Sequence, residues 1–319
     1  MVGGMSVAPI AAQPGSGRES WTSVMAALAA NTAIAIAKGT AAALTGSPAL
    51  LAETLHTVAD AGNEVLLWVA LRRSRRPADE SHPLGYGPER YYWALLAAIG
   101  MFVVGGALSV WEGVNALIHP PGLDDFWVGV GVLVIALLLD GASRAVASRG
   151  LRIQAEQRGV GVRQLLAETP DPTIVTVYLE DSIDVLGAAL ALLALVLHRT
   201  TGSAVPDAVA TLIIGLMLGY VAMRLSSRNR RLLANQGVPQ RYVDLLRERL
   251  DAAPGIHDVE SVTAVYLGPG EVLVTADVSM EPCQTSAELV AAIDRVRDEL
   301  LREFPAIARL YLTPVSIST

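Results

Sequence analysis

Two pairs of residues that commonly bind metal ions are each separated by four positions within apolar parts of the sequence. His56 is followed by Asp60, and Glu180 is followed by Asp184. On a helix, residues four apart lie on one face, so each pair can present two ligand atoms to one point. Asp181 adds a third carboxylate to the second segment. Imidazole and carboxylate groups suit tetrahedral Zn²⁺, and the same groups accept Mn²⁺, Fe²⁺ or Co²⁺.

Further polar residues continue both patterns at helical spacing. The two stripes consist of Glu53, His56, Asp60 and Asn63, and of Thr173, Thr176, Glu180 and Asp184. Such stripes cannot face lipid, so they must point into a helix bundle or a water-filled cavity. Each ionisable residue at bilayer depth costs about 2.5–3.5 kcal/mol, which a bound cation would offset. Hydrogen bonding between helices is the alternative role, and it suits a single Asn or Thr better than a group of carboxylates.

The segments that must position these residues are long and apolar. Of the 319 residues, 52% are hydrophobic, and the mean hydropathy is +0.43, which is typical of membrane proteins. A bilayer core of about 30 Å requires roughly 20 apolar residues per helix. We expect six such helices, at 23–46, 49–72, 91–117, 125–147, 173–198 and 206–226. The predicted fold is therefore an all-α membrane bundle of six transmembrane helices.

Arginine is concentrated in alternate connections of this bundle. The arginine-rich segments follow the second, fourth and sixth predicted spans, whereas 45–48 and 119–125 contain no Lys or Arg. By the positive-inside rule, both termini should lie in the cytosol. The formal net charge of −7 conceals this asymmetry, and we expect the lipid bilayer, and no nucleic acid, as a partner.

Single residues of unusual type lead to further expectations. Lys38 is the only lysine and lies within the first predicted span. We expect it either to form a structural pair with a carboxylate or to hold a carboxylate ionised when the metal is absent. Glu112 and Asp140 are expected to be interfacial charges near span ends. Cys283 is the only cysteine, so one chain can form neither a disulfide nor a cysteine-based zinc site. Residues 1–20 are expected to be a flexible N-terminal tail.

The composition changes to that of a soluble domain after the sixth span. Tyr242–Leu250 has helical spacing, and two alternating runs, 259–266 and 272–280, flank a Gly-Pro-Gly turn. Thr285 and Glu288 form a capping-box pattern ahead of a helix to about Phe304, and a short strand follows at 310–312. The order predicts a small cytosolic α+β (α-β-β-α-β, ferredoxin-like) domain. The expected division is thus a tail at 1–20, a six-helix membrane domain at 21–233 and a cytosolic domain at 234–319.

Four sequence motifs resemble those of the cation diffusion facilitator family of metal transporters. They are GSPALLAE at 46–53, LAETLHTVAD at 51–60, HPLGYGPERYYW at 82–93 and DPTIVTVYLEDSIDVLG at 171–187. The run Glu180-Asp181-Ser182 resembles the corresponding motif in the subgroup related to the ninth human zinc transporter. The resemblance implies that His56 and Asp60, with two residues from Glu180, Asp181 and Asp184, hold the transported ion.

The resemblance also implies features outside the membrane. A second cytosolic metal site would use Asp79 and His82, with Tyr86 where a histidine is usual. The C-terminal domain would form a homodimer and, in relatives, binds further metal, for which this domain offers His257 near Asp258, Asp277 and Cys283. Residues 148–170 contain no histidine, so the histidine-rich loop of many zinc exporters of the family is missing.

These observations predict a membrane transporter rather than an enzyme. We expect efflux of a divalent transition metal, zinc first, by alternating access, with protons as the exchanged ion and no tightly bound cofactor. We expect a multi-pass membrane protein, located in the cell membrane if the source is a prokaryote. An intramembrane metallohydrolase is the enzymatic alternative, but the His-Glu-x-x-His pattern is absent. A non-transporting metal sensor or scaffold is the other alternative.

Overall fold

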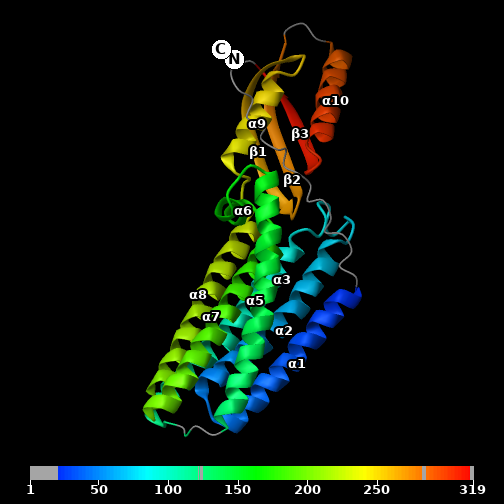
Figure 1. Ribbon diagram of the computed structural model, residues 1–319. Helices are drawn as coiled ribbons and strands as arrows, with labels where there is room; N and C mark the ends of the chain where they lie inside the picture. The colour runs from blue at the N-terminus through cyan, green and yellow to red at the C-terminus, as the bar shows by residue number, and fades with distance from the viewer. Residues whose placement is uncertain (1–20, 121, 123–124, 282–284, 317–319) are drawn as a thin grey trace.

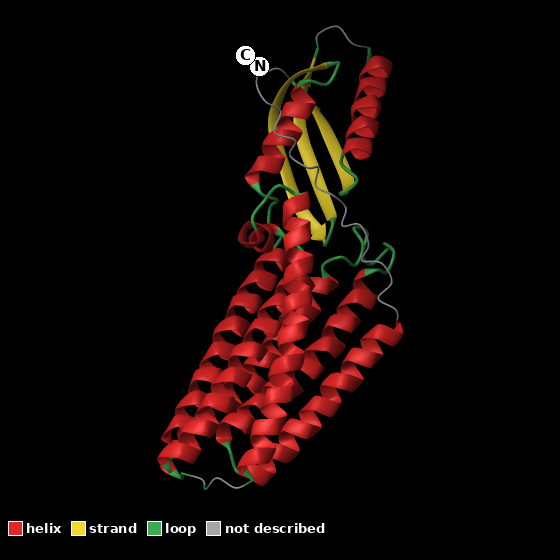
Figure 2. Ribbon diagram, in the orientation of Figure 1, coloured by secondary structure: helices red, strands yellow, loops and turns green. Residues whose placement is uncertain are grey.

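The computed structural model describes residues 21–120, 122, 125–281 and 285–316, except for the side chains of 21–30. The long helices lie side by side, and a small sheet flanked by two helices stands at one end of them (Figure 1, Figure 2). The predicted flexible tail at 1–20 and Cys283 lie outside the described residues.

Helices form at all six segments that the sequence predicted to span a membrane. They are α1 (Trp21–Thr45), α2 (Pro48–Ser74), α3 (Glu89–Gly100) continued by η1 (Met101–Ala107) and α4 (Leu108–Ile118), α5 (Phe126–Gln157), α7 (Pro172–Thr201) and α8 (Val205–Leu233). Within the described residues, four spans are long and apolar enough to cross a bilayer: 89–118, 126–157, 172–201 and 205–233. α2 is not among them, because polar side chains such as Asp60 and Glu64 lower its hydropathy. Several crossings are thus supported, and six remain a prediction.

The third predicted span is interrupted by the π-helical segment η1, for which the sequence contains no clear signal. This segment contains Gly105 and Gly106. A Cβ added at Gly106 would lie 3.2 Å from the backbone nitrogen of Gly219 on α8, so the two backbones approach closely here. Small residues permit such contacts between membrane helices. The glycines therefore fix how α8 packs against this span.

The connection predicted at 148–170 is largely helical. α5 continues to Gln157, beyond its predicted end, and the short helix α6 (Val162–Glu168) follows. Asp171 then caps α7, since its side chain accepts a hydrogen bond from the backbone nitrogen of Thr173 at 3.0 Å. Pro172 occupies the first turn of α7. An acidic cap followed by proline is a strong helix start, and it sets the register of α7.

The C-terminal residues adopt the predicted α-β-β-α-β order. The elements are α9 (Gln240–Asp251), β1 (Ile256–Gly268), β2 (Glu271–Met280), α10 (Ser286–Glu303) and β3 (Ile307–Val315). β2 is the central strand and pairs antiparallel with β1 and parallel with β3. Gly270 has a φ of +80° in the turn between β1 and β2, and the predicted capping box of Thr285 and Glu288 is present. Alternate residues of β2 and one face of each helix form the core.

The sheet domain is in direct contact with the bundle. Tyr91, in the first turns of α3, is fully buried within the hydrophobic core of the sheet domain. Gly87 lies against the end of β1, because a side chain there would collide with the carbonyl oxygen of Leu267. Arg241 of α9 forms an ion pair with Glu168 of α6. The start of α3 and the α6 segment are therefore attached to the sheet domain.

Candidate metal centre

α2 supplies two of the side chains that were predicted from the sequence to be metal ligands. Ser47 caps this helix, accepting a hydrogen bond from the backbone nitrogen of Leu50 at 3.2 Å, and Pro48 occupies the first position. The capped start fixes which residues of α2 face the bundle interior. His56 and Asp60 both lie on that buried face.

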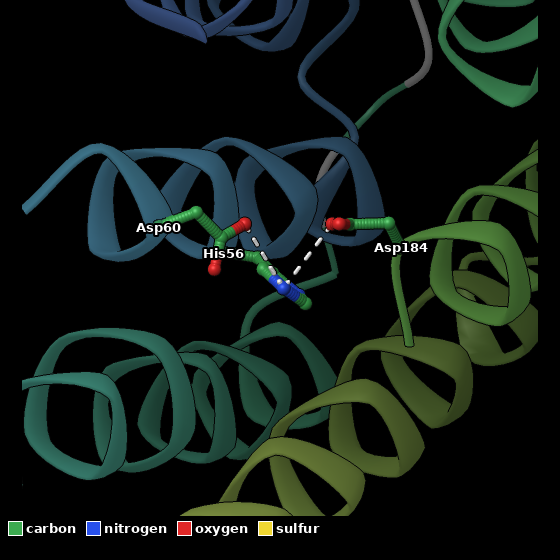
Figure 3. Close-up of side chains that lie close together, drawn as sticks. All are labelled: His56, Asp60 and Asp184. Carbon is green, nitrogen blue, oxygen red and sulfur yellow. Dashed lines mark ion pairs between the residues drawn. The ribbon is translucent and has the colours of Figure 1, made fainter. Parts of the chain in front are cut away.

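His56 lies between carboxylates from two different helices (Figure 3). Its Nε2 atom is 3.1 Å from Asp60 Oδ2 and 3.2 Å from Asp184 Oδ1 of α7. One ligand atom from each residue lies within 4.8 Å of the other two. In the described part of the chain, this is the one group of three or more His, Cys, Asp or Glu side chains that converges in this way. These three residues are the candidate site for a metal ion, and here we call them the metal centre.

Ion pairing engages only some of the polar atoms in this group. Among the described residues, His56 Nε2 forms ion pairs with the two carboxylates, whereas His56 Nδ1 and Asp60 Oδ1 have no hydrogen-bond partner. Buried polar atoms normally have partners. One imidazole and two carboxylates directed at a common point match the ligands of divalent transition metals. The three side chains are therefore a candidate site for a metal ion.

The structure separates Glu180 and Asp181 from the three converging residues. Glu180 Oε1 accepts a hydrogen bond from the side-chain amide of Asn63 on α2, one turn from Asp60. Asp60 and Asp184 remain among its closest charged neighbours. Asp181 is half-buried and lies beside Arg144 and Asp140 of α5. Of the three carboxylates on α7, Asp184 thus contacts His56, Glu180 lies nearby and Asp181 faces α5.

The prediction for Lys38 is confirmed by the structure, whereas the prediction for Asp140 is wrong. The predicted pairing of Lys38 is confirmed, because its Nζ atom lies 3.1 Å from Glu53 Oε2. Asp140 was expected near a span end, but α5 extends to Gln157 and places it midway along the helix. Lys38, Glu53 and His56 are among its charged neighbours. A single carboxylate within an apolar segment could have indicated this position inside the bundle. Because the predicted span ended at residue 147, Asp140 was instead placed near a span end.

The side chains of the implied second cytosolic site are engaged in a turn. Asp79 Oδ2 accepts a hydrogen bond from Tyr86 Oη at 2.7 Å, and Oδ1 accepts one from Ser81 Oγ at 2.7 Å. Hydrogen bonds from Ser81, Tyr86 and the His82 backbone hold the pKa of Asp79 well below its usual range. The His82 ring stacks on Tyr86 with centroids 4.0 Å apart. Both Asp79 oxygens are thus occupied by local contacts.

The remaining histidines do not enlarge the metal centre. His257 is exposed on β1, and its proposed companion Asp277 accepts a hydrogen bond from Ser261 at 2.7 Å. His198 is buried near the end of α7, where its Nδ1 lies 3.7 Å from Asp207 Oδ2 of α8. His119 is exposed at the end of α4. His56 is therefore the histidine on which the centre depends.

Comparison with known proteins identifies a family that matches most of the bundle. The model of the cation efflux transmembrane domain matches residues 24–234. That segment extends from α1 to the end of α8 and contains every residue of the metal centre.

Individual relatives come from an animal, a plant and a bacterium. The chain is 31% identical over 258 residues to the mitochondrial proton-coupled zinc antiporter of Homo sapiens, covering 81% of this chain and 45% of that protein. It is 32% identical over 235 residues to metal tolerance protein C4 of Arabidopsis thaliana, covering 73% and 51%. The cation-efflux pump FieF of Escherichia coli is 26% identical over 267 residues, covering 82% and 81%. The chain thus spans about half the length of the human and plant relatives that it matches.

Proposed function

Because the chain belongs to the cation efflux family, we propose that it exports divalent transition metals from the cytosol, with Zn²⁺ as its main substrate. The members of this family transport cations and are not enzymes. One observation carries the proposal: Nε2 of His56 lies between carboxylate oxygens of Asp60 and Asp184, at 3.1 and 3.2 Å. The zinc antiporter among the relatives supports zinc, and the same ligands would accept Mn²⁺, Fe²⁺ or Co²⁺.

His56, Asp60 and Asp184 are the proposed ligands of the transported ion. Glu180 is the proposed fourth ligand, since it lies close to Asp60 and Asp184 and only one amide hydrogen bond holds it. Asp181 is proposed to attract the cation before it reaches the centre, because it lies farther along the bundle toward the arginine-rich end, beside Asp140. Four nitrogen and oxygen ligands would complete a tetrahedral shell for zinc.

Proton exchange is the proposed source of the driving force. Carboxylates bind metals in their deprotonated form, so metal binding to Asp60 and Asp184 releases any protons that they hold. The ligands come from α2 and α7, so a relative movement of these helices would expose the centre to one side and then to the other. Metal efflux and proton uptake would thereby use the same carboxylates in turn.

The proposed domain division follows the sequence expectation: a tail at 1–20, a six-helix transport domain at 21–233 and a cytosolic dimerisation domain at 234–319. The arginine-rich ends of α2, α5 and α8 lie at the end of the bundle that carries the sheet domain (Figure 1). This placement supports cytosolic termini. Val290 of α10 and Tyr311 of β3 are exposed apolar residues of the sheet domain, which supports a homodimer contact there.

Flux measurements in proteoliposomes test the proposed activity. Purified protein should carry Zn²⁺ into vesicles when an opposing proton gradient is imposed, and an enclosed pH dye should report proton movement with each pulse of metal. The Asp184→Ala variant, correctly inserted, should carry none. Stoichiometric zinc binding by the intact protein without any flux would instead identify a metal sensor or scaffold.

A further inference from the structure

A second buried ion pair lies one helical turn from the metal centre. Lys38 Nζ of α1 donates hydrogen bonds to Glu53 Oε2 at 3.1 Å and to Thr57 Oγ1 at 3.0 Å, both on α2. The Lys38 and Glu53 side chains are 2% and 0% exposed. Glu53 precedes His56 by three positions, so the pair lies on the side of the centre that faces the Ser47 end of α2.

The same pair also contacts α7. A side chain at Gly187 would collide with Glu53 Oε1, so the Glu53 carboxylate occupies the space between α2 and α7. Gly187 follows Asp184 by three positions, one turn along α7 in the same direction. The Lys38–Glu53 pair therefore joins α1, α2 and α7 in one layer next to the centre. Two of these helices are those that supply the metal ligands.

The carboxylate side chains of the metal centre are more exposed than the side chains of the Lys38–Glu53 ion pair. The Asp60 and Asp184 side chains remain 12% and 18% exposed, whereas the ion pair is sealed. A cation moving from the centre toward Ser47 along the interface of α2 and α7 would meet the Glu53 carboxylate and the Lys38 ammonium group that is paired with it. Farther along, Ser47 Oγ donates a hydrogen bond to Asp207 Oδ1 at 3.0 Å. Buried polar groups thus continue beyond the ion pair.

We propose that Lys38 and Glu53 form the gate that closes the metal centre on the side of Ser47, an inference that rests on the proposed transport function. In the closed state, Lys38 holds Glu53 against Gly187 and opposes a cation by its charge. Opening requires α2 and α7 to separate, which removes Glu53 from Gly187 and breaks its pairing with Lys38. A buried ion pair stabilises a fold little better than apolar residues of similar size would, so a role in switching explains it better.

The gate can be tested by the accessibility of a cysteine at the centre. The reporter carries Asp60→Cys in a Cys283→Ser background, which leaves one thiol. A membrane-impermeant methanethiosulfonate reagent is applied separately to the two faces of sealed vesicles. We expect Lys38→Gln and Glu53→Gln to raise the labelling rate from the Ser47 face at least tenfold. The swapped variant, Lys38→Glu with Glu53→Lys, restores the ion pair and should return the rate toward that of the reporter protein.

Glu64→Gln is the matched control. Glu64 of α2 accepts a hydrogen bond from Asn31 of α1 at 2.7 Å, so it joins the same two helices on the other side of the centre. This variant should leave labelling from the Ser47 face unchanged. If a single variant does not insert, the double variant Lys38→Gln with Glu53→Gln should show the same acceleration.

Three results would overturn the gate: equal rates in the reporter and in the Lys38 and Glu53 variants, an equal rise in the Glu64 control, or a swapped variant that labels as fast as the single ones. The proposed function is tested separately, by zinc flux through the Cys283→Ser protein with its native centre. Absence of that flux would refute transport, whatever the labelling shows.

Discussion

The Nε2 atom of His56 and the Oδ1 atom of Asp184 lie 3.2 Å apart and join α2 to α7 in the interior of the bundle. The same helices also meet on each side of this contact, about one turn away along α7. Asn63 donates a hydrogen bond to Glu180 on one side, and Glu53 packs against Gly187 on the other. The metal centre is thus the middle of three polar layers between α2 and α7. Any change in the spacing of these helices must alter the geometry of the centre.

Asp60→Ala should abolish metal transport while the protein remains folded and inserted. Asp60 Oδ2 lies 3.1 Å from His56 Nε2, and removing this ligand leaves the proposed shell incomplete. Flux of zinc, manganese and cobalt should be measured in vesicles that contain the purified variant. Glu112→Gln on α4 is the control, because that half-buried carboxylate lies outside the metal centre. Flux of all three metals near the wild-type rate would remove Asp60 from the centre.

Asp184→Asn should be the most damaging of three single amide substitutions on α7. Asp184 contacts His56 directly, whereas Glu180 is held by Asn63 and Asp181 faces α5. An amide retains the size of the carboxylate but loses its charge, so the ranking should follow proximity to the ion. Zinc affinity and flux of Glu180→Gln, Asp181→Asn and Asp184→Asn should be compared at equal protein amounts. A ranking in which Asp184→Asn is the mildest contradicts this geometry.

Asp79→Asn should leave the number of bound zinc ions unchanged. Tyr86 and Ser81 already donate hydrogen bonds to the two oxygens of Asp79, each at 2.7 Å, so binding a metal would require the turn to rearrange. Equilibrium dialysis of the purified protein gives the stoichiometry, and Asp60→Asn, expected to lower it, is the comparison. Loss of one zinc ion in Asp79→Asn would show that the turn does form a second site.

Arg90→Met should destabilise the bundle strongly. Arg90 Nη2 lies 2.9 Å from both oxygens of Asp171, the cap of α7, and both side chains are buried. Removing one member of such a pair leaves a buried charge and costs about 3–5 kcal/mol. Arg297→Met is the control, since its pair with Asp294 is exposed and worth only about 0–1 kcal/mol. Thermal unfolding in detergent should show a clear decrease for the first variant, and equal decreases would refute the interpretation.

Local spacing was sufficient to predict which residues share a helix face. The contact between His56 and Asp60 could be predicted from their i,i+4 spacing alone. The capping box of Thr285 and Glu288 could be predicted from its residue types. The choice among the carboxylates of α7 could not be predicted in this way. It depends on how α7 is rotated against α2 and α5, and packing of particular side chains, such as Glu53 against Gly187, sets that rotation.

The interrupted third span and the junction with the sheet domain also escaped prediction. The π-helical segment contains Gly106, whose backbone lies against Gly219 of α8, a contact between residues far apart in the sequence. No feature of the sequence around Tyr91 indicated that this residue is buried in the core of the sheet domain. Tertiary contacts of this kind leave no periodic signal in the sequence, because a single residue on each side is enough to form them.

The fragment 236–319, expressed alone, should fold and form a homodimer. Its core contains buried residues from both helices and all three strands, among them Leu246, Val274, Phe304 and Leu310. A domain of this size has a modest core, so burial of the exposed Val290 and Tyr311 in a dimer would add stability. Sedimentation should show a dimer at micromolar concentration. A monomeric fragment together with a monomeric full-length protein in detergent would exclude this dimer.

Truncation after Leu233 should weaken transport and stability but leave zinc binding at the metal centre. The truncated protein loses the core that surrounds Tyr91 and the ion pair between Arg241 and Glu168, so the ends of α3 and α6 become exposed. His56, Asp60 and Asp184 should keep their contacts with one another, because these contacts join α2 and α7 within the bundle. Zinc titration of the truncated protein, with insertion confirmed by protease protection, should therefore retain the high-affinity site. Complete loss of binding in an inserted protein would show that the sheet domain shapes the centre itself.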